Sequence, residues 1–237
     1  MENDFCYIEK NLISVREKIN KAVCERSDKY SGAVRLLAVT KTVEAEKINF
    51  AVSKGVDLIG ENRADELLGK YDKINRDGLE IHFIGNLQTN KVKYIIDKVN
   101  MIHSVNSIRL AEEINKRAVL HNIKMDVLIE INIGGEESKT GIKPKNAVEL
   151  IYSLKNFENL NIKGLMTVPP PVGKLGKPEI IKIFNKMHEI FIEISLKKAN
   201  NINMSVLSMG MSEDYEEAIS CGSNIVRIGR AVFGGRI

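Results

Sequence analysis

Short apolar runs that alternate with longer amphipathic segments constrain the fold of this chain more than any other feature. Each run is only a few residues long and several are rich in Val and Ile, which is typical of strands buried on both faces. Eight runs have this character: Leu36–Val39, Leu58–Gly60, Ile81–Gly85, Met101–Val105, Val127–Ile133, Ile162–Met166, Ser205–Leu207 and Ile225–Ile228. Strands that alternate with helices in this way pair in parallel through helical crossovers.

Amphipathic helices are predicted between the runs. Glu44–Lys54, Ser107–His121 and Pro178–Lys198 each gather apolar side chains on one face, and a further helix precedes the first strand. Eight strand–helix units within 237 residues predict an α/β protein, a single (β/α)8 TIM-type barrel with an extra N-terminal helix. Residues 1–30 would form the helix packed on the barrel, and residues 31–237 the barrel. An open doubly wound sheet is the alternative.

Composition excludes several classes of protein. The net charge of +4 comes from 35 basic and 31 acidic residues that are scattered along the chain, so nucleic-acid binding is not predicted. The three cysteines, Cys6, Cys24 and Cys221, are odd in number and lack CxxC spacing, which argues against a disulfide framework or a zinc site. No apolar run approaches the roughly 20 residues that span a bilayer, and the acidic N-terminus does not resemble a signal peptide. We therefore expect a cytoplasmic protein with no membrane contact.

The C-terminal ends of the strands are where a barrel of this type carries its site. Lys41 is the sharpest candidate there, because it closes the apolar strand that begins at Leu36. In a partly desolvated mouth the pKa of an amine falls, and a neutral amine can attack a carbonyl to form a Schiff base. The alternative is a lysine that simply leaves the strand into water, as most lysines do.

The segments after the seventh and eighth strands have the character of a phosphate site. Barrels often bind phosphate there through backbone N–H groups and a helix N-terminus. Ser208–Ser212 leads into a helix for which Ser212 is a suitable N-cap, and Gly229 would let backbone N–H groups approach an anion. Ordinary capping and a tight turn are the alternative. A Schiff-base lysine and a phosphate site on one rim together indicate a phosphorylated aldehyde.

Two of the polar residues inside predicted strands are candidates for the site. A buried Arg227 needs a partner, which is either the ring nitrogen of a pyridine cofactor or a carboxylate such as Glu61 or Glu130. His82 faces the core or stacks on a flat ligand. The other histidines show no metal-ligand spacing, so no metal site is predicted.

Several motifs, in order and at family-like spacing, resemble those of a known family. They are Leu36–Thr42, Gly60–Asn62, His82–Lys91, Ile131–Ile133, Ser138–Gly141, Gly164–Thr167, Leu207–Ser212 and Val226–Gly234. The chain resembles the pyridoxal phosphate homeostasis proteins, single-domain barrels related to the N-terminal domain of alanine racemase. The resemblance covers roughly Leu36 to Arg236.

This resemblance implies roles for individual residues around pyridoxal 5′-phosphate (PLP). Lys41 resembles the lysine that holds PLP as a Schiff base. Asn62 and His82 resemble residues that line the cofactor ring, and Arg227 resembles the partner of the pyridine nitrogen.

The resemblance also implies a phosphate cradle made of Ser212, Gly229 and Arg230. Arg230 departs from the family, which commonly has a small hydroxyl residue at this position. Either the guanidinium adds a charged contact to the phosphate, or the side chain turns outward and only its backbone N–H contributes.

The function that the resemblance implies is intracellular PLP (vitamin B6) homeostasis without robust catalytic turnover. Racemisation on this barrel needs a second base, which in alanine racemase a tyrosine of the C-terminal β-domain supplies, and this chain ends soon after the eighth strand. An arginine facing the pyridine nitrogen also weakens the ring as an electron sink. The alternatives are a PLP-dependent amino-acid racemase or lyase, and a lysine-dependent aldolase without cofactor. We expect a monomer whose partners are PLP and PLP-accepting apo-enzymes.

Overall fold

The computed structural model describes residues 5–30, 32–136, 139–197 and 200–235. Its eight strands form one closed barrel in chain order, and every neighbouring pair is parallel, including β1 with β8. The strands are β1 Arg35–Val39, β2 Leu58–Glu61, β3 Glu80–Phe83, β4 Met101–Val105, β5 Met125–Glu130, β6 Leu160–Met166, β7 Ile202–Ser208 and β8 Ile225–Ile228. The TIM-type barrel is therefore confirmed, and the open sheet is excluded because β1 and β8 are hydrogen-bonded to each other.

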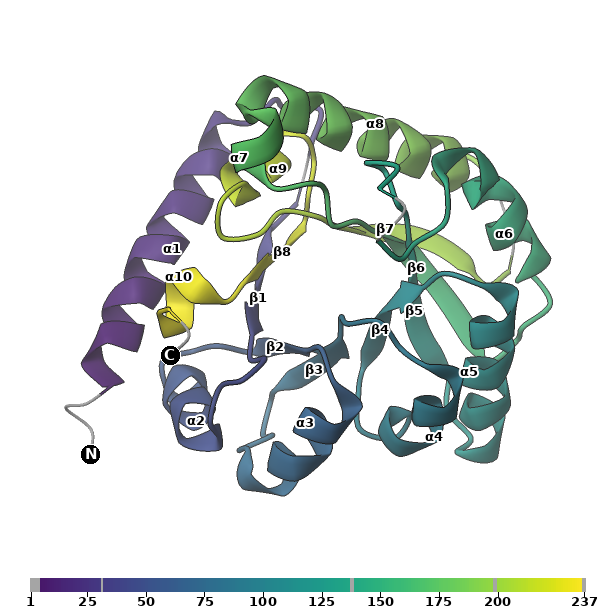
Figure 1. Cartoon of the computed structure of the whole chain (residues 1–237), viewed down its shortest axis with the longest axis horizontal. Helices are drawn as coiled ribbons and strands as arrows, with labels where there is room; N and C mark the ends of the chain where they lie inside the picture. Colours follow the sequence, from purple (N-terminus) through teal and green to yellow (C-terminus); the bar gives the residue numbers. More distant parts are fainter. Residues whose placement is uncertain (1–4, 31, 137–138, 198–199, 236–237) are drawn as a thin grey trace.

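The helices surround the ring of strands, as Figure 1 shows in a view onto the barrel. The α-helices are α1 Cys6–Glu25, α2 Ala45–Ser53, α3 Ala64–Lys70, α4 Val92–Ile95, α5 Ile108–Leu120, α6 Ala147–Ser153, α7 Val172–Leu175, α8 Lys177–Ser195, α9 Tyr215–Ser220 and α10 Arg230–Phe233. Short 3-10 helices are η2 Tyr71–Lys73, η3 Thr89–Lys91 and η4 Pro144–Asn146. The apolar faces of the α-helices and the outward-facing residues of the strands form one continuous core.

The predicted elements lie within a few residues of the observed ones. α5 begins where Ser107 accepts a hydrogen bond from the backbone N–H of Leu110 at 3.3 Å, as an N-cap serine should. β5 ends at Glu130, earlier than predicted, because Ile131 leaves the strand and pairs with Ile142 as an isolated bridge. Ser138, part of one motif above, lies outside the described residues.

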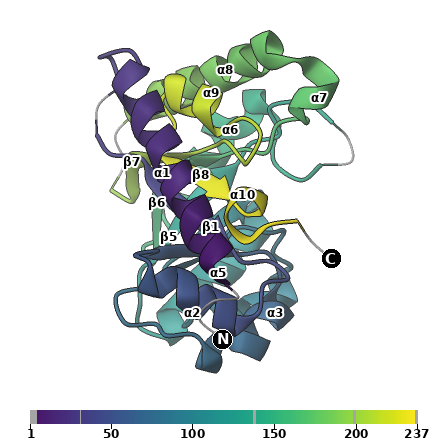
Figure 2. The ribbon, with the colours of Figure 1, turned by 90° about the vertical axis from the view of Figure 1, so that its left-hand side faces the viewer.

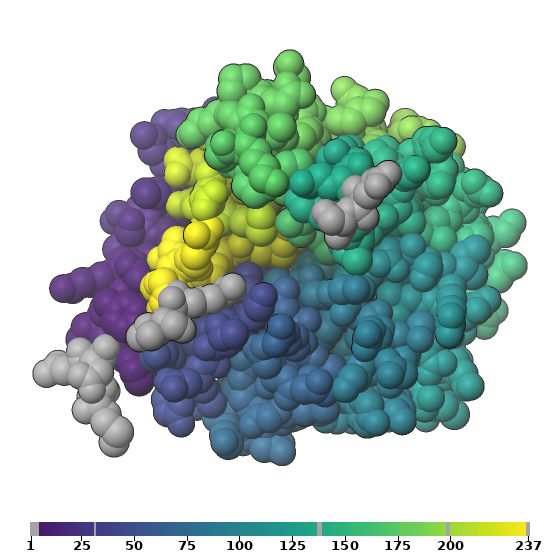
Figure 3. All heavy atoms as spheres, in the orientation of Figure 1, coloured from purple at the N-terminus to yellow at the C-terminus, as the bar shows by residue number. Residues whose placement is uncertain are grey.

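Helix α1 covers the side of the barrel on which β1 and β8 pair. It packs against α9, α10 and α2, and Asn11 Nδ2 donates to the carbonyl of Val232 at 3.0 Å. Figure 2 shows α1 crossing this side beside α9 and α10, and in Figure 3 the purple atoms of the first helix lie against the yellow atoms of the segment after β8. The packing therefore supports the segment after β8 from outside. The domain boundary at residue 30 stays a prediction.

Within the described ranges, no helix combines the length and the apolar character that a bilayer crossing requires. In the same part of the chain, no cluster of His, Cys, Asp and Glu is suited to hold a metal ion.

Candidate functional site

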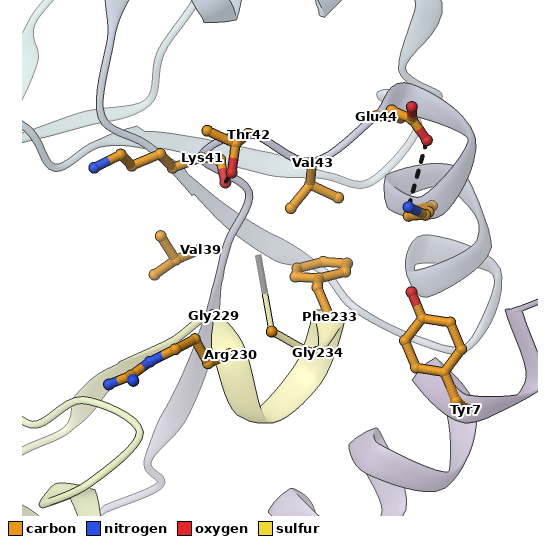
Figure 4. Close-up of a pocket in the computed structure, with 12 residues that line it drawn as sticks. Tyr7, Val39, Lys41, Thr42, Val43, Glu44, Gly229, Arg230, Phe233 and Gly234 are labelled. Carbon is orange, nitrogen blue, oxygen red and sulfur yellow. Dashed lines mark hydrogen bonds and ion pairs between the residues drawn. The ribbon is translucent and has the colours of Figure 1, made fainter. Parts of the chain in front are cut away.

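Lys41 and the loop after β8 line one cavity of about 320 Å³. Lys41 follows β1 directly, and Gly229 follows β8, so the pairing of these two strands brings the residues together. Figure 4 shows the cationic ends of Lys41 and Arg230 extending to the same side, away from Tyr7. The structure thus places a half-buried amine beside the segment in which the sequence predicted a phosphate site.

Ser212 lies half-buried in the loop between β7 and α9. The prediction that it caps the following helix is wrong: α9 begins at Tyr215, with Asp214 as its N-cap. The backbone N–H of Met211 donates to Asp214 Oδ1 at 2.6 Å, so the carboxylate holds the loop. Gly210 has φ +93°, and a Cβ there would lie 2.6 Å from Ala218 Cβ, so the tight turn requires glycine.

Arg230 and Glu213 connect the loops that follow β7 and β8. Arg230 Nη2 lies 2.5 Å from Glu213 Oε1, and both side chains are largely exposed. The sequence left two positions open for the Arg230 side chain, and the structure places it on this carboxylate. Gly229 precedes it at the start of α10, and a Cβ at this glycine would lie 3.3 Å from Val39 Cβ, so glycine allows the end of β8 to approach β1 closely.

Arg227 is 4% exposed and its guanidinium is held by neutral oxygens. Nη1 donates to Ser208 Oγ at 2.7 Å, and Nη2 donates to the carbonyl oxygen of Thr167 at 2.6 Å. Burial lowers the pKa of Arg227 to about 10, against the opposing charges of Asp214 and Glu130, so it remains a cation at pH 7. Among the described residues no carboxylate forms a direct ion pair with it.

A chain of polar side chains continues from Arg227 across the barrel interior. Ser208 Oγ lies 3.2 Å from His103 Nδ1, and His103 Nε2 lies 2.9 Å from His82 Nδ1. His82 Nε2 lies 3.3 Å from Glu80 Oε2. Both imidazoles are buried. The sequence left open whether His82 faces the core or stacks on a ligand, and the structure shows that its side chain is buried and that both of its ring nitrogens contact protein side chains. Its contact with a cofactor ring stays a prediction.

The direction of each hydrogen bond in this chain follows from the proton count. Arg227 can only donate, so Ser208 Oγ accepts from it and donates its own proton to His103 Nδ1. Burial lowers the pKa of His82 and lowers that of His103 well below its usual value, so both rings are neutral. A neutral His103 that accepts at Nδ1 carries its proton on Nε2 and donates it to His82, which in turn donates from Nε2 to Glu80.

We expect His82 and His103 both to be neutral Nε2–H tautomers at pH 7. Long-range 1H–15N spectra of protein labelled at its 4 histidines would show this. His121→Gln and His188→Gln variants would assign the remaining two imidazoles. An Nδ1–H tautomer or a cationic ring at position 82 or 103 would contradict the ordered chain.

Glu80 makes the stability of the folded protein depend on pH. Hydrogen bonds from His82 and Arg35 lower the pKa of Glu80 from 4.5 to about 2. Because the folded-state pKa lies below the unfolded one, the carboxylate stabilises the fold above about pH 4.5, and this contribution is lost as the pH falls toward 2. We expect urea unfolding to show a constant stability difference between wild type and Glu80→Gln from about pH 7 to 5 that shrinks below about pH 4.5. A difference that does not vary with pH would contradict the lowered pKa.

Asn62 faces a neighbouring cavity of about 300 Å³, between the loops after β2 and β3. Its Oδ1 is buried without a hydrogen-bond partner among the described residues, and so are Ser104 Oγ and Glu130 Oε2. Each of these residues lies in the C-terminal half of a strand or directly after one. Buried polar atoms left unpaired cost free energy, which points to a ligand or water at this end of the barrel.

The sequence missed His103, Ser208 and Thr167 as members of the site. No sequence signal identified His103, because residues two apart in a strand share a face but the register between two strands is set by the structure. His82 pairs in register with Met101, so His103 lies on the same face two residues further on.

Comparison with known proteins defines the class of this barrel. Residues 18–237 match the family described as "Alanine racemase, N-terminal domain". A structure from Bifidobacterium adolescentis, described as an unknown protein, is 34% identical, with a TM-score of 0.90 and coverage of 97% of this chain and 95% of that chain. Fold and site thus define a barrel of the alanine racemase N-terminal domain class.

More specific relatives narrow this class. The pyridoxal phosphate homeostasis protein of Aquifex aeolicus (strain VF5) is 46% identical over 228 residues, which are 96% of this chain and 97% of that protein. PipY of Synechococcus elongatus PCC7942, in its structure with PLP bound, is 27% identical with a TM-score of 0.80, covering 96% of this chain and 100% of PipY. The chain belongs to the family of pyridoxal phosphate homeostasis proteins.

Proposed function

We propose that this protein binds PLP through Lys41 and acts in intracellular vitamin B6 homeostasis. The observation that carries the proposal is that one cavity is lined both by the half-buried Lys41 and by the loop after β8, which contains Gly229. The PLP-bound structure of PipY supports the same ligand for a protein with this fold.

The residues present fit this cofactor. When bound, PLP supplies an aldehyde that condenses with an amine with loss of water, and a phosphate dianion. Lys41 offers the amine, and the loops carrying Ser212, Gly229 and Arg230 offer backbone N–H groups and a cation to the phosphate. Asn62 Oδ1 is a buried acceptor without a protein partner in the described chain, as expected of an atom that faces a ligand.

Arg227 would hold the ring nitrogen by donating one of the N–H groups that its bonds to Ser208 and Thr167 do not use. Because it stays cationic at pH 7, it donates a hydrogen bond without handing over a proton. His82 would line the cofactor ring, with its own ring held in place by His103 and Glu80. Arg230 would have to leave or share Glu213 to reach the phosphate.

A PLP-dependent amino-acid racemase or lyase is the second candidate, since alanine racemase has the same type of barrel. If Arg227 holds the pyridine nitrogen as proposed, the ring stays unprotonated and is a poor electron sink, which favours the homeostasis role. We further propose a cytoplasmic monomer that passes PLP to apo-enzymes.

Exchange of the α-hydrogen of amino acids separates the two candidates. We expect protein loaded with PLP to release label from α-deuterated L-amino acids no faster than free PLP at the same concentration. Proton NMR would follow the exchange, with PLP-free protein as the control. Exchange well above that of free PLP would sink the homeostasis proposal and favour the enzyme.

A further inference from the structure

The backbone turn that carries Lys41 is held by a buried cation. We call Thr40–Val43 the Lys41 turn. Lys70 lies at the end of α3, and its Nζ donates hydrogen bonds to the carbonyl of Thr40 at 2.7 Å and to that of Val43 at 3.3 Å. These two carbonyls lie on either side of Lys41, so one ammonium group fixes both ends of the turn. Lys70 is only 9% exposed, which is unusual for lysine.

Glu61 completes this arrangement. Its Oε1 lies 2.6 Å from Lys70 Nζ and also accepts a hydrogen bond from the Thr40 hydroxyl. Glu61 is fully buried at the end of β2, and its Oε2 has no hydrogen-bond partner among the described residues. A buried ion pair rarely repays its desolvation as net stability. Its persistence here is better explained by what it holds in place.

The turn itself is strained. Thr42 has φ +61°, a left-handed conformation that a β-branched residue rarely adopts. Its backbone N–H donates to Glu66 Oε2 at 2.8 Å, and the N–H of Val43 donates to the Thr40 carbonyl at 3.0 Å. Such a conformation persists only where the surroundings over-determine it.

We propose that Lys70 and Glu61 are positioning residues that clamp the Lys41 turn and aim the Lys41 amine at the carbonyl it attacks. The inference rests on the proposed function, because it assumes that Lys41 reacts with the PLP aldehyde. The clamp acts through the backbone: it holds the carbonyls next to Lys41 and leaves the amine free to react. Without it, the strained Thr42 relaxes and the amine samples many directions.

Two variants separate positioning from plain stability. Lys70→Met leaves Glu61 buried without a countercharge, so it lowers both the melting temperature and the rate at which full-length protein acquires the absorption band of lysine-bound PLP. Glu61→Gln/Lys70→Met removes the orphaned charge, so it recovers most of the melting temperature. We expect its rate of band formation to stay at least about tenfold below wild type, because a misplacement of about 1 Å can cost about a hundredfold in rate.

The control is Lys163→Met, which removes a half-buried lysine that lies 3.8 Å from Asp126 in the barrel wall. It should leave the rate unchanged. Hydrogen exchange of the Val43 amide in PLP-free protein gives a readout that needs no cofactor, and we expect it to be at least about tenfold faster in the double variant.

The outcomes distinguish this inference from the function on which it rests. A double variant that forms the band at the wild-type rate, or protects the Val43 amide as wild type does, overturns the clamp. A wild-type protein that never acquires the band overturns the proposed function and with it the aim of the clamp, whatever the exchange rates are. A lower rate in the double variant at an intact melting temperature supports both.

Discussion

Lys41→Ala is expected to lose completely the absorption band that wild-type protein acquires with PLP and keeps through desalting. No other described lysine shares the cavity with the loop after β8 except Lys47, which is engaged by Glu44 at 3.4 Å. Removing the Lys41 amine therefore removes the nucleophile, and residual binding relies on the non-covalent contacts to the phosphate and the ring. Visible spectra of both proteins, incubated with PLP and desalted, provide the measurement.

Lys182→Ala is the matched control, because this lysine is exposed on α8 and its one ion-pair partner among the described residues is Glu179 of the same helix. It should keep the band in full. If Lys41→Ala retains the band as well, PLP is bound to another residue and Lys41 has no role in holding it. If all proteins remain colourless, the cofactor assignment itself is wrong.

Gly85→Ala is expected to destabilise the protein by about 3 kcal/mol or more, because the added methyl group has no space. A Cβ at this glycine would lie 2.0 Å from the backbone oxygen of Asn62 and 2.7 Å from its Cα. The clash is with backbone, which cannot rotate away, so the loop after β2 must move and take Asn62 with it. Thermal unfolding should show a decrease of roughly 10 °C in a chain of this size.

Gly69→Ala tests the same substitution in open space. Nothing lies within 4 Å of a Cβ at this position in α3, and alanine favours a helix over glycine by about 1 kcal/mol. We therefore expect Gly69→Ala to be neutral or slightly stabilising. Equal effects of the two substitutions would mean that the loops after β2 and β3 are not pressed together.

Much of the fold was predictable from the chain. Parallel strands buried on both faces require apolar runs, and helical crossovers require amphipathic segments, so both kinds of element left local patterns. The boundaries were less certain because they depend on partners: β7 extends to Ile202 through pairing with β6, although Ile202–Met204 carries no long apolar run. The loop after Pro171 contains the short helix α7, Val172–Leu175. A helix of one turn is too short to show a periodic pattern in the sequence, so it was not predicted.

The candidate site was predictable only where residues follow strands. Lys41 and Gly229 could be placed on one rim because all strands of a barrel end at the same face. The start of α9 could not, since Ser212 and Asp214 are both good caps and only the loop geometry after Gly210 selects Asp214. Nor could the partner of Arg230, because the contact with Glu213 joins two loops that are distant in sequence.

By itself, the sequence determined the order of strands and helices and the position of Lys41 at the end of the first strand, since these follow from local periodicity and from the direction of parallel strands. The closure of the sheet into a barrel depends on the pairing of β1 with β8, which is a tertiary contact. Only the tertiary structure decided which polar side chains meet inside the barrel. The ordered chain from Arg227 to Glu80, and the contact of Lys70 with the turn around Lys41, join residues from separate strands and helices. Such pairings depend on register and on which groups burial leaves in need of a partner, and no local pattern records either.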